Sequence, residues 1–470
     1  MGRRDARHGS RLAFWLPVLL VVALLGGAGT AYWLDRDQPD PKDDPEQVAP
    51  PSGLELPPLT DPAPVAAAAV GTADPAKVRR ALAPLLRDDD LGPHVLSTVA
   101  GLDGSLLFTD GAGEAVPAST LKLLTATAAL ETMGPDHTFA TTVVSAGPRR
   151  IVLVGGGDPL LSATRPERGD YPRPADVVTL ARATAAQLQA SGTSRIRLGY
   201  DATLFTGPDV SPHWPPSYIP DGVVAPIQSL WVDEGRPLEG TGRVDDPAQV
   251  AATVFATALA KAGIDVVGVP EPRSVDPAAT EIARVTSPSL AQIVEHTLLV
   301  SDNEAAEVLA RHVAIATGAP ATFVGGADAV LSTVAGLGVP TSGATTYDGS
   351  GLSRDNRLDP DTLTGVLELA GSDDHPDLRA VLTGLPVAGF NGSLSERFAE
   401  TSDREGRGSV RAKTGTLTGV SGLAGTVTDR TGTPMVFAVL ADDIALLDTL
   451  DARAALDDVA AALAACRCAA

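Results

Sequence analysis

Residues 117–132 read PASTLKLLTATAALET, and the interpretation of the whole chain starts from this stretch. Pro117 precedes a run that predicts an apolar helix from Ser119 to about Thr132. Positions three apart share a helix face, so the Ser119 hydroxyl and the Lys122 amine are expected to lie together. A serine hydroxyl beside a neutral lysine amine is a nucleophile–base pair that needs no histidine.

Lysine is rare in this chain. Of 36 basic residues only five are lysines, at positions 42, 77, 122, 261 and 413. An amine can lose its proton once its pKa is lowered, whereas a guanidinium effectively cannot. A lysine kept in so arginine-rich a chain therefore indicates proton chemistry, although a Ser-x-x-Lys motif alone is also typical of an ordinary surface.

Two further motifs follow at long distance. Ser301-Asp302-Asn303 lies in the break between two predicted helices, and Lys413-Thr414-Gly415-Thr416 lies on a predicted strand. Ser-x-x-Lys, Ser-x-Asn and Lys-Thr-Gly in this order are the motif set of β-lactamases and penicillin-binding proteins. Asp302 is expected to cap the helix that follows it rather than to take part in chemistry.

The chain thereby resembles the penicillin-recognising serine D,D-peptidases. The closer resemblance is to the D-alanyl-D-alanine carboxypeptidase/endopeptidase group of low-molecular-mass, class C type penicillin-binding proteins, which carry a large insertion after the nucleophile. Ser119 and Ser301 are 182 positions apart (301 − 119), as such an insertion requires. Three more stretches of the sequence look like that group: 154–159 (VGGGDP), 225–235 (API to VDEG) and 347–354 (YDGSGLSR).

The resemblance implies a role for each site residue. Ser119 would attack the carbonyl between two terminal D-alanines, and Lys122, made neutral by burial and by the like charge of Lys413, would take its proton. Ser301 and Lys413 would pass a proton to the leaving amine, while Asn303 would bind the substrate backbone and steady Lys122. The oxyanion would lie between the N–H groups of Ser119 and Thr416. Thr414 and Thr416 would hold the substrate carboxylate, and Gly415 would leave room for substrate along the strand.

Apolar patterns predict helices at about 175–190, 247–262 and 289–300, and consecutive strands at 411–414, 422–428 and 435–440. Strands, then helices, then strands and a closing helix predict an α+β fold. The expected architecture is a β-lactamase/transpeptidase-like domain, an antiparallel sheet flanked by helices, formed by residues 76–139 and 289–465. An inserted α/β domain would occupy 140–288. The last helix, about 445–465, is expected to pack on the sheet through Leu447, Leu450, Ala454 and Leu463.

The N-terminus carries targeting signals. Four arginines in the first eleven residues precede an uncharged apolar run at 12–34, long enough to span a bilayer. Residues 1–34 therefore predict a membrane anchor, with a cleaved signal peptide as the alternative. Either segment exports the rest of the chain, and 35–75 is a proline-rich linker. Residues 466–470, with Cys466 and Cys468, are expected to be an inert tail. A disulfide between residues two apart would be strained, although an oxidising exterior would permit one.

Composition narrows the remaining choices. The formal net charge of −22 argues against nucleic-acid binding. The resemblance implies peptidoglycan stem peptides as substrates and β-lactams as inhibitors, and the apolar N-terminal run adds the membrane as a partner. The seven histidines show no metal-ligand spacing, so a zinc hydrolase is not expected, and no metal and no cofactor are predicted. No Gly-x-Ser-x-Gly is present, which argues against an α/β-hydrolase triad. Two alternatives stay open: a β-lactamase or esterase on the same scaffold, and a non-catalytic wall-binding protein.

Overall fold

The computed structural model describes residues 71–276 and 278–470, so the predicted anchor and most of the predicted linker lie outside the described residues. Within the described ranges, no helix combines the length and the apolar character needed to cross a membrane.

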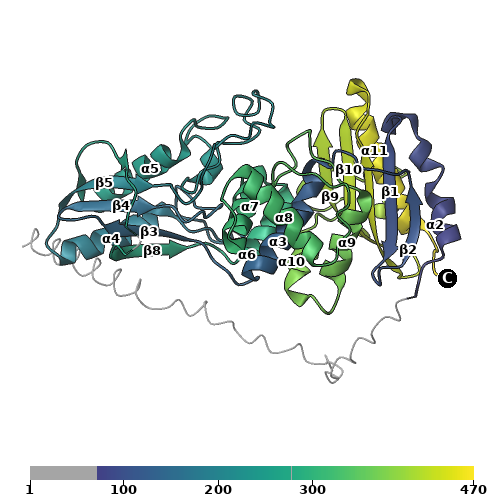
Figure 1. Cartoon of the computed structure of the whole chain (residues 1–470), viewed down its shortest axis with the longest axis horizontal. Coiled ribbons are helices and arrows are strands. Elements are labelled where there is room, and N and C mark those ends of the chain that lie inside the picture. Colours follow the sequence, from purple (N-terminus) through teal and green to yellow (C-terminus); the bar gives the residue numbers. More distant parts are fainter. Residues whose placement is uncertain (1–70, 277) are drawn as a thin grey trace, which may run out of the picture. The chain divides into compact units, whose positions relative to one another are not determined.

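An antiparallel five-stranded sheet forms one half of the fold, with strand order β2-β1-β11-β10-β9 (Figure 1). Its strands are β1 (Val95–Gly101), β2 (Leu106–Asp110), β9 (Val410–Leu417), β10 (Val420–Thr428) and β11 (Pro434–Ala441). Strand β1 pairs with β11 from the far end of the chain, Val95 opposite Ala441. The chain between residues 110 and 410 is therefore inserted between the two parts of one sheet. Strand β9 lies at an edge of this sheet.

Helices cover both faces of this sheet because its strands are apolar on both sides. Val99, Phe437 and Val439 face α2 (Pro75–Leu82) and α11 (Thr449–Ala465). Ala100, Ala438 and Leu440 alternate with them and face a helical layer. That layer consists of α3 (Lys122–Met133), α6 (Leu290–Val300), α7 (Asn303–Thr317), α8 (Phe323–Gly336), α9 (Pro360–Gly371) and α10 (Arg379–Thr383).

A second, six-stranded sheet is built entirely from residues between α3 and α6, in the order β6-β5-β4-β3-β8 with β7 beside β5. Its strands are β3 (Ala140–Ser145), β4 (Arg150–Val154), β5 (Arg195–Asp201), β6 (Asp265–Val266), β7 (Glu271–Pro272) and β8 (Glu281–Thr286). Helices α4 (Val177–Ala190) and α5 (Pro247–Lys261) pack on it and share its apolar core. Parallel β4–β5 and antiparallel β3–β4 pairs make this sheet mixed.

Two sequence-based expectations are wrong. Helix α11 does not pack through Leu447, Leu450 and Ala454, since all three are exposed. Its buried face is Ala452, Ala455, Leu456, Val459, Ala460 and Leu463. The α-helix begins only at Thr449, so Leu447 precedes it, while Leu450 and Ala454 lie within it on its exposed side.

The C-terminal tail is also not inert. Ala469 pairs with Ala73, Cys468 is buried and disulfide-bonded to Cys466, and the Asp74 N–H donates to the Cys468 carbonyl. The tail therefore joins the last helix to the segment that leads into α2.

Candidate active site

Ser119 lies in a short 3-10 helix, Ala118–Leu121, that leads into α3. The sequence predicted an α-helix from Ser119, so this turn is tighter than expected. Ala118 just before it has φ +46°, a left-handed conformation that is rare outside glycine. Gly351 packs directly against this turn. Any side chain there would collide with it, because a Cβ at position 351 would lie 1.9 Å from the Ala118 carbonyl oxygen.

Lys122 is fully buried at the start of α3 and contacts three oxygens. Its Nζ lies 2.9 Å from Ser119 Oγ, 2.8 Å from Asn303 Oδ1 and 2.7 Å from the Ser350 carbonyl. Burial lowers the pKa of this amine to about 8, although the nearby charges of Glu307 and Asp348 favour the protonated form.

The break between α6 and α7 presents Ser301 and Asn303. Ser301 ends α6 in the left-handed conformation, φ +62°, which turns the chain sharply. As predicted, Asp302 caps α7: its side chain accepts a hydrogen bond from the Ala305 N–H. Asn303 then starts α7, and its side-chain amide donates to the Val223 carbonyl at 3.1 Å while Oδ1 faces Lys122.

Lys413 lies on the edge strand β9 and is fully buried. Its Nζ donates to Ser301 Oγ at 2.7 Å and to the Thr414 carbonyl at 2.9 Å. Burial, and then the positive charge of Lys122, lower the pKa of Lys413 well below its usual value. The sequence predicted that the charge of Lys413 lowers the pKa of Lys122. In the structure, the charge of Lys122 lowers the pKa of Lys413.

The structure brings the three motifs of the sequence together. A first chain of contacts runs Ser119–Lys122–Asn303, and a second runs Lys413–Ser301. Because Ser301 and Asn303 are two residues apart, the two amines approach the same turn from different elements. The repulsion between them is the physical sign that they share one buried environment.

The Lys-Thr-Gly-Thr segment runs along the open edge of the sheet. Ala412 donates its N–H to the Pro386 carbonyl on the side away from β10. Since this direction alternates along a strand, the N–H groups of Thr414 and Thr416 point the same way. Thr416 is exposed, whereas the Thr414 hydroxyl lies 2.8 Å from that of Ser393, a residue that sequence reasoning missed.

The structure shows a steric requirement for Gly415 that the sequence did not predict. A Cβ at this position would lie 2.6 Å from the Pro117 carbonyl oxygen and 3.3 Å from the Ser119 nitrogen. The glycine therefore lets β9 lie directly against the turn that carries Ser119. No alanine-sized side chain fits there without moving one of the two backbones.

Residues around the 347–354 turn support Lys122 from behind. Glu307 on α7 is buried and accepts hydrogen bonds from the Gly349 and Ser350 N–H groups, which aims the Ser350 carbonyl at Lys122. Burial and the Asp348 charge raise the pKa of Glu307 to about 7. Asp348, buried, accepts from Trp214, Asn356 and two backbone N–H groups, so it organises the turn. The sequence motif at 347–354 marked this turn but not its contact with Lys122.

One loop from the region of the six-stranded sheet also reaches the site. Besides the Val223–Asn303 contact, the Ala225 N–H donates to Glu304 Oε1 at 3.1 Å, and Arg243 Nε donates to the same oxygen at 2.6 Å. The Arg243–Glu304 ion pair is almost fully buried. It therefore fastens residues 223–225 beside Asn303.

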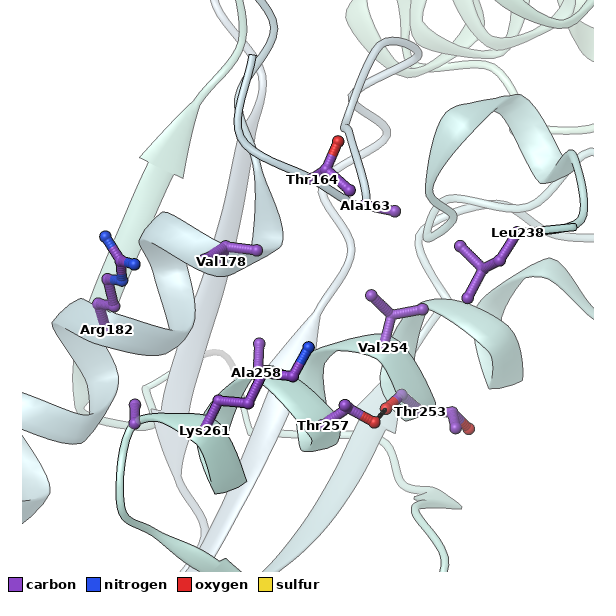
Figure 2. A pocket seen from close by; sticks show the side chains of 11 residues that line it. Ala163, Thr164, Val178, Arg182, Leu238, Thr253, Val254, Thr257, Ala258 and Lys261 are labelled. Atoms are coloured by element: carbon purple, nitrogen blue, oxygen red, sulfur yellow. Dashed lines mark hydrogen bonds between the residues drawn. The ribbon is translucent and has the colours of Figure 1, made fainter. Parts of the chain in front are cut away.

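A cavity of about 410 Å³ lies elsewhere, between α4 and α5 (Figure 2). Val178 and Val254 line it, with Arg182 and Lys261 on the two helices that flank it. None of its lining residues belongs to the three motifs. Among the described residues, no buried polar atom that lacks a hydrogen bond lines it, so it offers no chemistry of its own.

A Ser–Lys pair without histidine, at the edge of an antiparallel sheet covered by helices, defines a class of serine hydrolases that form acyl-enzymes. The chain matches the D-Ala-D-Ala carboxypeptidase 3 (S13) family over residues 78–241 and 236–463, and it belongs to that family. It is thus a serine peptidase, and the resemblance found in its motifs is confirmed.

Curated relatives agree with this assignment. A carboxypeptidase of Mycobacterium tuberculosis is 37% identical over 410 residues, 84% of this chain and 86% of the relative. Carboxypeptidase DacB of Mycolicibacterium smegmatis is 38% identical, over 83% of this chain and 84% of that protein. Similarity of this extent covers both the motif-bearing segments and the residues between them.

Among solved structures, penicillin binding protein 4 of Haemophilus influenzae shares the fold. Its TM-score is 0.66 at 21% identity, over 82% of this chain and 97% of that chain. A second structure of that protein, in complex with a β-lactam, has a TM-score of 0.60 over the same share of each chain. The predicted α+β class is thereby confirmed.

Proposed function

We propose that this enzyme hydrolyses the terminal D-Ala-D-Ala bond of peptidoglycan stem peptides through an acyl-enzyme on Ser119. The observation that carries the proposal is the surroundings of the Lys122 amine. A neutral amine has two N–H donors and one lone pair. Asn303 Oδ1 and the Ser350 carbonyl take up the two donors, which leaves the lone pair for the Ser119 hydroxyl.

Acylation begins when Lys122 accepts the Ser119 proton while Oγ attacks the carbonyl carbon of the penultimate D-alanine. A pKa of about 8 suits this task, because a general base works best when its pKa is near the working pH. The negative oxygen that develops would lie between the N–H groups of Ser119 and Thr416. One such donor contributes roughly 100- to 1,000-fold to the rate.

The second contact chain would serve the leaving group. As the C–N bond breaks, Ser301 Oγ donates its proton to the D-alanine amine and takes one from Lys413, across their 2.7 Å contact. Lys413 must therefore hold a proton when substrate is bound. The substrate carboxylate, held by Thr416 and Thr414 near Lys413, raises the pKa of that amine and so supplies this condition.

The protonated Lys413 would have the opposite effect on Lys122 and lower the pKa of that amine. A positive charge on Lys413 repels a proton from Lys122, so binding of an anionic substrate assigns the base and acid roles to the two amines. Water then attacks the acyl-enzyme and releases the shortened peptide. β-Lactams carry an equivalent carboxylate and are expected to acylate Ser119 as inhibitors.

The remaining parts of the chain also receive proposed roles. Residues 76–139 and 289–465 would form the catalytic domain and 140–288 an inserted domain. Residues 1–34 would anchor the enzyme in the membrane and 35–75 would space it from the surface, so that it acts outside the cytoplasm on the cell wall.

The test is release of free D-alanine from a stem pentapeptide by the full-length enzyme. We expect release by the wild type, loss after preincubation with penicillin, and loss in Ser119→Ala. Release that persists in Ser119→Ala would refute the acyl-enzyme on this residue. A chromogenic β-lactam turned over faster than the peptide would instead favour the β-lactamase alternative, and cleavage of cross-linked dimers would add endopeptidase action.

A further inference from the structure

Three potential ligands that the mechanism does not use lie directly behind the Ser301–Asn303 turn. They are Glu234 in the 3-10 turn Asp233–Gly235, His296 on α6, and Asp302 at the start of α7. One oxygen or nitrogen of each lies within 4.8 Å of the others. Their spacing in sequence gives no metal motif, because three separate elements bring them together.

Both carboxylates are buried, and Asp302 has one oxygen without a hydrogen-bond partner. Asp302 is 7% exposed. Its Oδ1 caps α7, but Oδ2 has no hydrogen-bond partner and points towards His296 Nε2, 3.9 Å away. Glu234 is 8% exposed, and its Oε2 has no hydrogen bond, although Arg236 forms an ion pair with it. Two buried carboxylates that face each other are costly, and a cation between them would remove the cost.

We propose that Glu234, His296 and Asp302 bind one divalent transition-metal cation of the zinc type. One imidazole and two carboxylates are a donor set that zinc accepts, whereas magnesium and calcium prefer oxygen alone. Tetrahedral ligands about 2.1 Å from a zinc ion stand ~3.4 Å apart, so modest side-chain rotations close the cluster around the ion.

The surroundings allow a cation to enter. A cavity of about 330 Å³ opens beside the cluster and is lined by Glu234, Arg236, His296 and Tyr171. Three protein ligands leave a fourth coordination position for a water molecule from this cavity. Arg236 is the competitor for Glu234, and its half-exposed side chain can turn into solvent when the cation binds.

Asp302 connects this site to the catalytic residues. It stands between Ser301 and Asn303 in the chain, and its carboxylate would bind the cation on the side opposite Lys122. A bound cation would therefore hold the turn between α6 and α7 from behind, without contact with substrate. The proposal does not depend on the assigned catalytic roles, because its test measures binding.

The experiment titrates zinc alone into the full-length, metal-stripped enzyme by calorimetry. We expect one ion per chain. Glu234→Gln, His296→Gln and Asp302→Asn should each weaken binding by at least ~10-fold, the asparagine still capping α7. His213→Gln is the matched control, because the His213 ring pairs with Asp355 and stacks on Tyr347 and is not part of the proposed site, so this variant should bind zinc like the wild type.

Arg236→Ala gives a readout that a misfolded variant cannot imitate. Removal of the competing guanidinium should tighten zinc binding and increase the zinc-dependent rise in unfolding temperature. Labelling of Ser119 by fluorescent penicillin checks that each variant is folded. No zinc binding by the wild type, or binding that is unchanged in both Glu234→Gln and His296→Gln, would overturn the proposal. So would looser binding in Arg236→Ala.

Discussion

At the scale of single residues, the site depends on two buried amines, and protonation of both at once is unfavourable. Lys122 and Lys413 each lose hydration, and each contacts a serine hydroxyl, Ser119 and Ser301 respectively. Desolvation favours the neutral amine, and the charge of one amine disfavours protonation of the other. A guanidinium would stay charged at either position. Replacement by arginine should therefore affect Lys122, which must become neutral, more than Lys413.

Lys122→Arg should abolish acylation, because arginine keeps the charge but has no lone pair for the Ser119 proton. Lys413→Arg should retain part of the activity, since its role depends more on charge. The measurement is labelling of Ser119 by fluorescent penicillin together with D-alanine release. Ordinary acylation in Lys122→Arg would contradict the neutral-amine mechanism.

The pH dependence of acylation follows from the same amine. Burial lowers the pKa of Lys122 to about 8, and only the deprotonated form acts as a base. The rate constant for acylation by a β-lactam should therefore rise with pH and level off above about pH 8, because the amine is mostly charged below this value. A rate that is flat from pH 6 to 9 would show that Lys122 is not the titrating base.

At the scale of elements, the position of β9 against the Ser119 turn is set by a missing side chain. Gly415→Ala places a Cβ 2.6 Å from the Pro117 carbonyl, so the strand must move away from the turn. A displacement of about 1 Å in a catalytic group can cost on the order of 100-fold in rate, and we expect a loss of kcat/KM of this size.

The control for Gly415→Ala is Gly336→Ala at the end of α8, where a new Cβ meets no atom within 4 Å. This variant should keep wild-type kinetics and unfold at the same or a higher temperature. Equal kinetics in the two variants would show that contact between β9 and the turn does not position the site.

The Arg243–Glu304 pair gives a second prediction at this scale. Arg243→Ala leaves Glu304 buried and unpaired, which typically costs about 3–5 kcal/mol, and it loosens residues 223–225 beside Asn303. We expect a lower free energy of unfolding and a lower kcat. Arg284→Ala breaks an exposed pair with Glu281 and should cost less than about 1 kcal/mol with unchanged kcat. Denaturant unfolding and peptide kinetics distinguish these outcomes.

At the scale of the whole molecule, the contacts that define the site join Ser119, Lys122, Ser301, Asn303 and Lys413, all of which follow residue 71. A chain that begins at residue 71 should release D-alanine from a soluble pentapeptide at the wild-type rate. The full-length chain should sediment with membranes, and the shortened one should remain in solution. Loss of activity in the shortened chain would show that the N-terminal segment contributes more than an anchor.

Much of the fold followed from local patterns. Apolar periodicity predicted α4, α5, α6 and the three C-terminal strands to within a few residues, because the apolar pattern of each element is local in the sequence. Short or irregular elements such as β3, β8 and α10 were missed. The predicted face of α11 was wrong because apolar residues occur on more than one side of this alanine-rich helix, so the pattern alone did not single out the buried side.

The amino-acid order alone predicted the candidate reactive side chains: two serines, two lysines and an asparagine, whose chemistry belongs to the residue types and whose grouping is typical of one enzyme family. Only tertiary packing decided that the Ser350 carbonyl oxygen faces Lys122 and that the charge of Lys122 lowers the pKa of Lys413. It also decided that Gly415 lets strand β9 lie against the backbone of the Ser119 turn. Such facts depend on which distant segments touch. Hydrogen-bond partners and dielectric surroundings arise from that contact and leave no local pattern in the sequence.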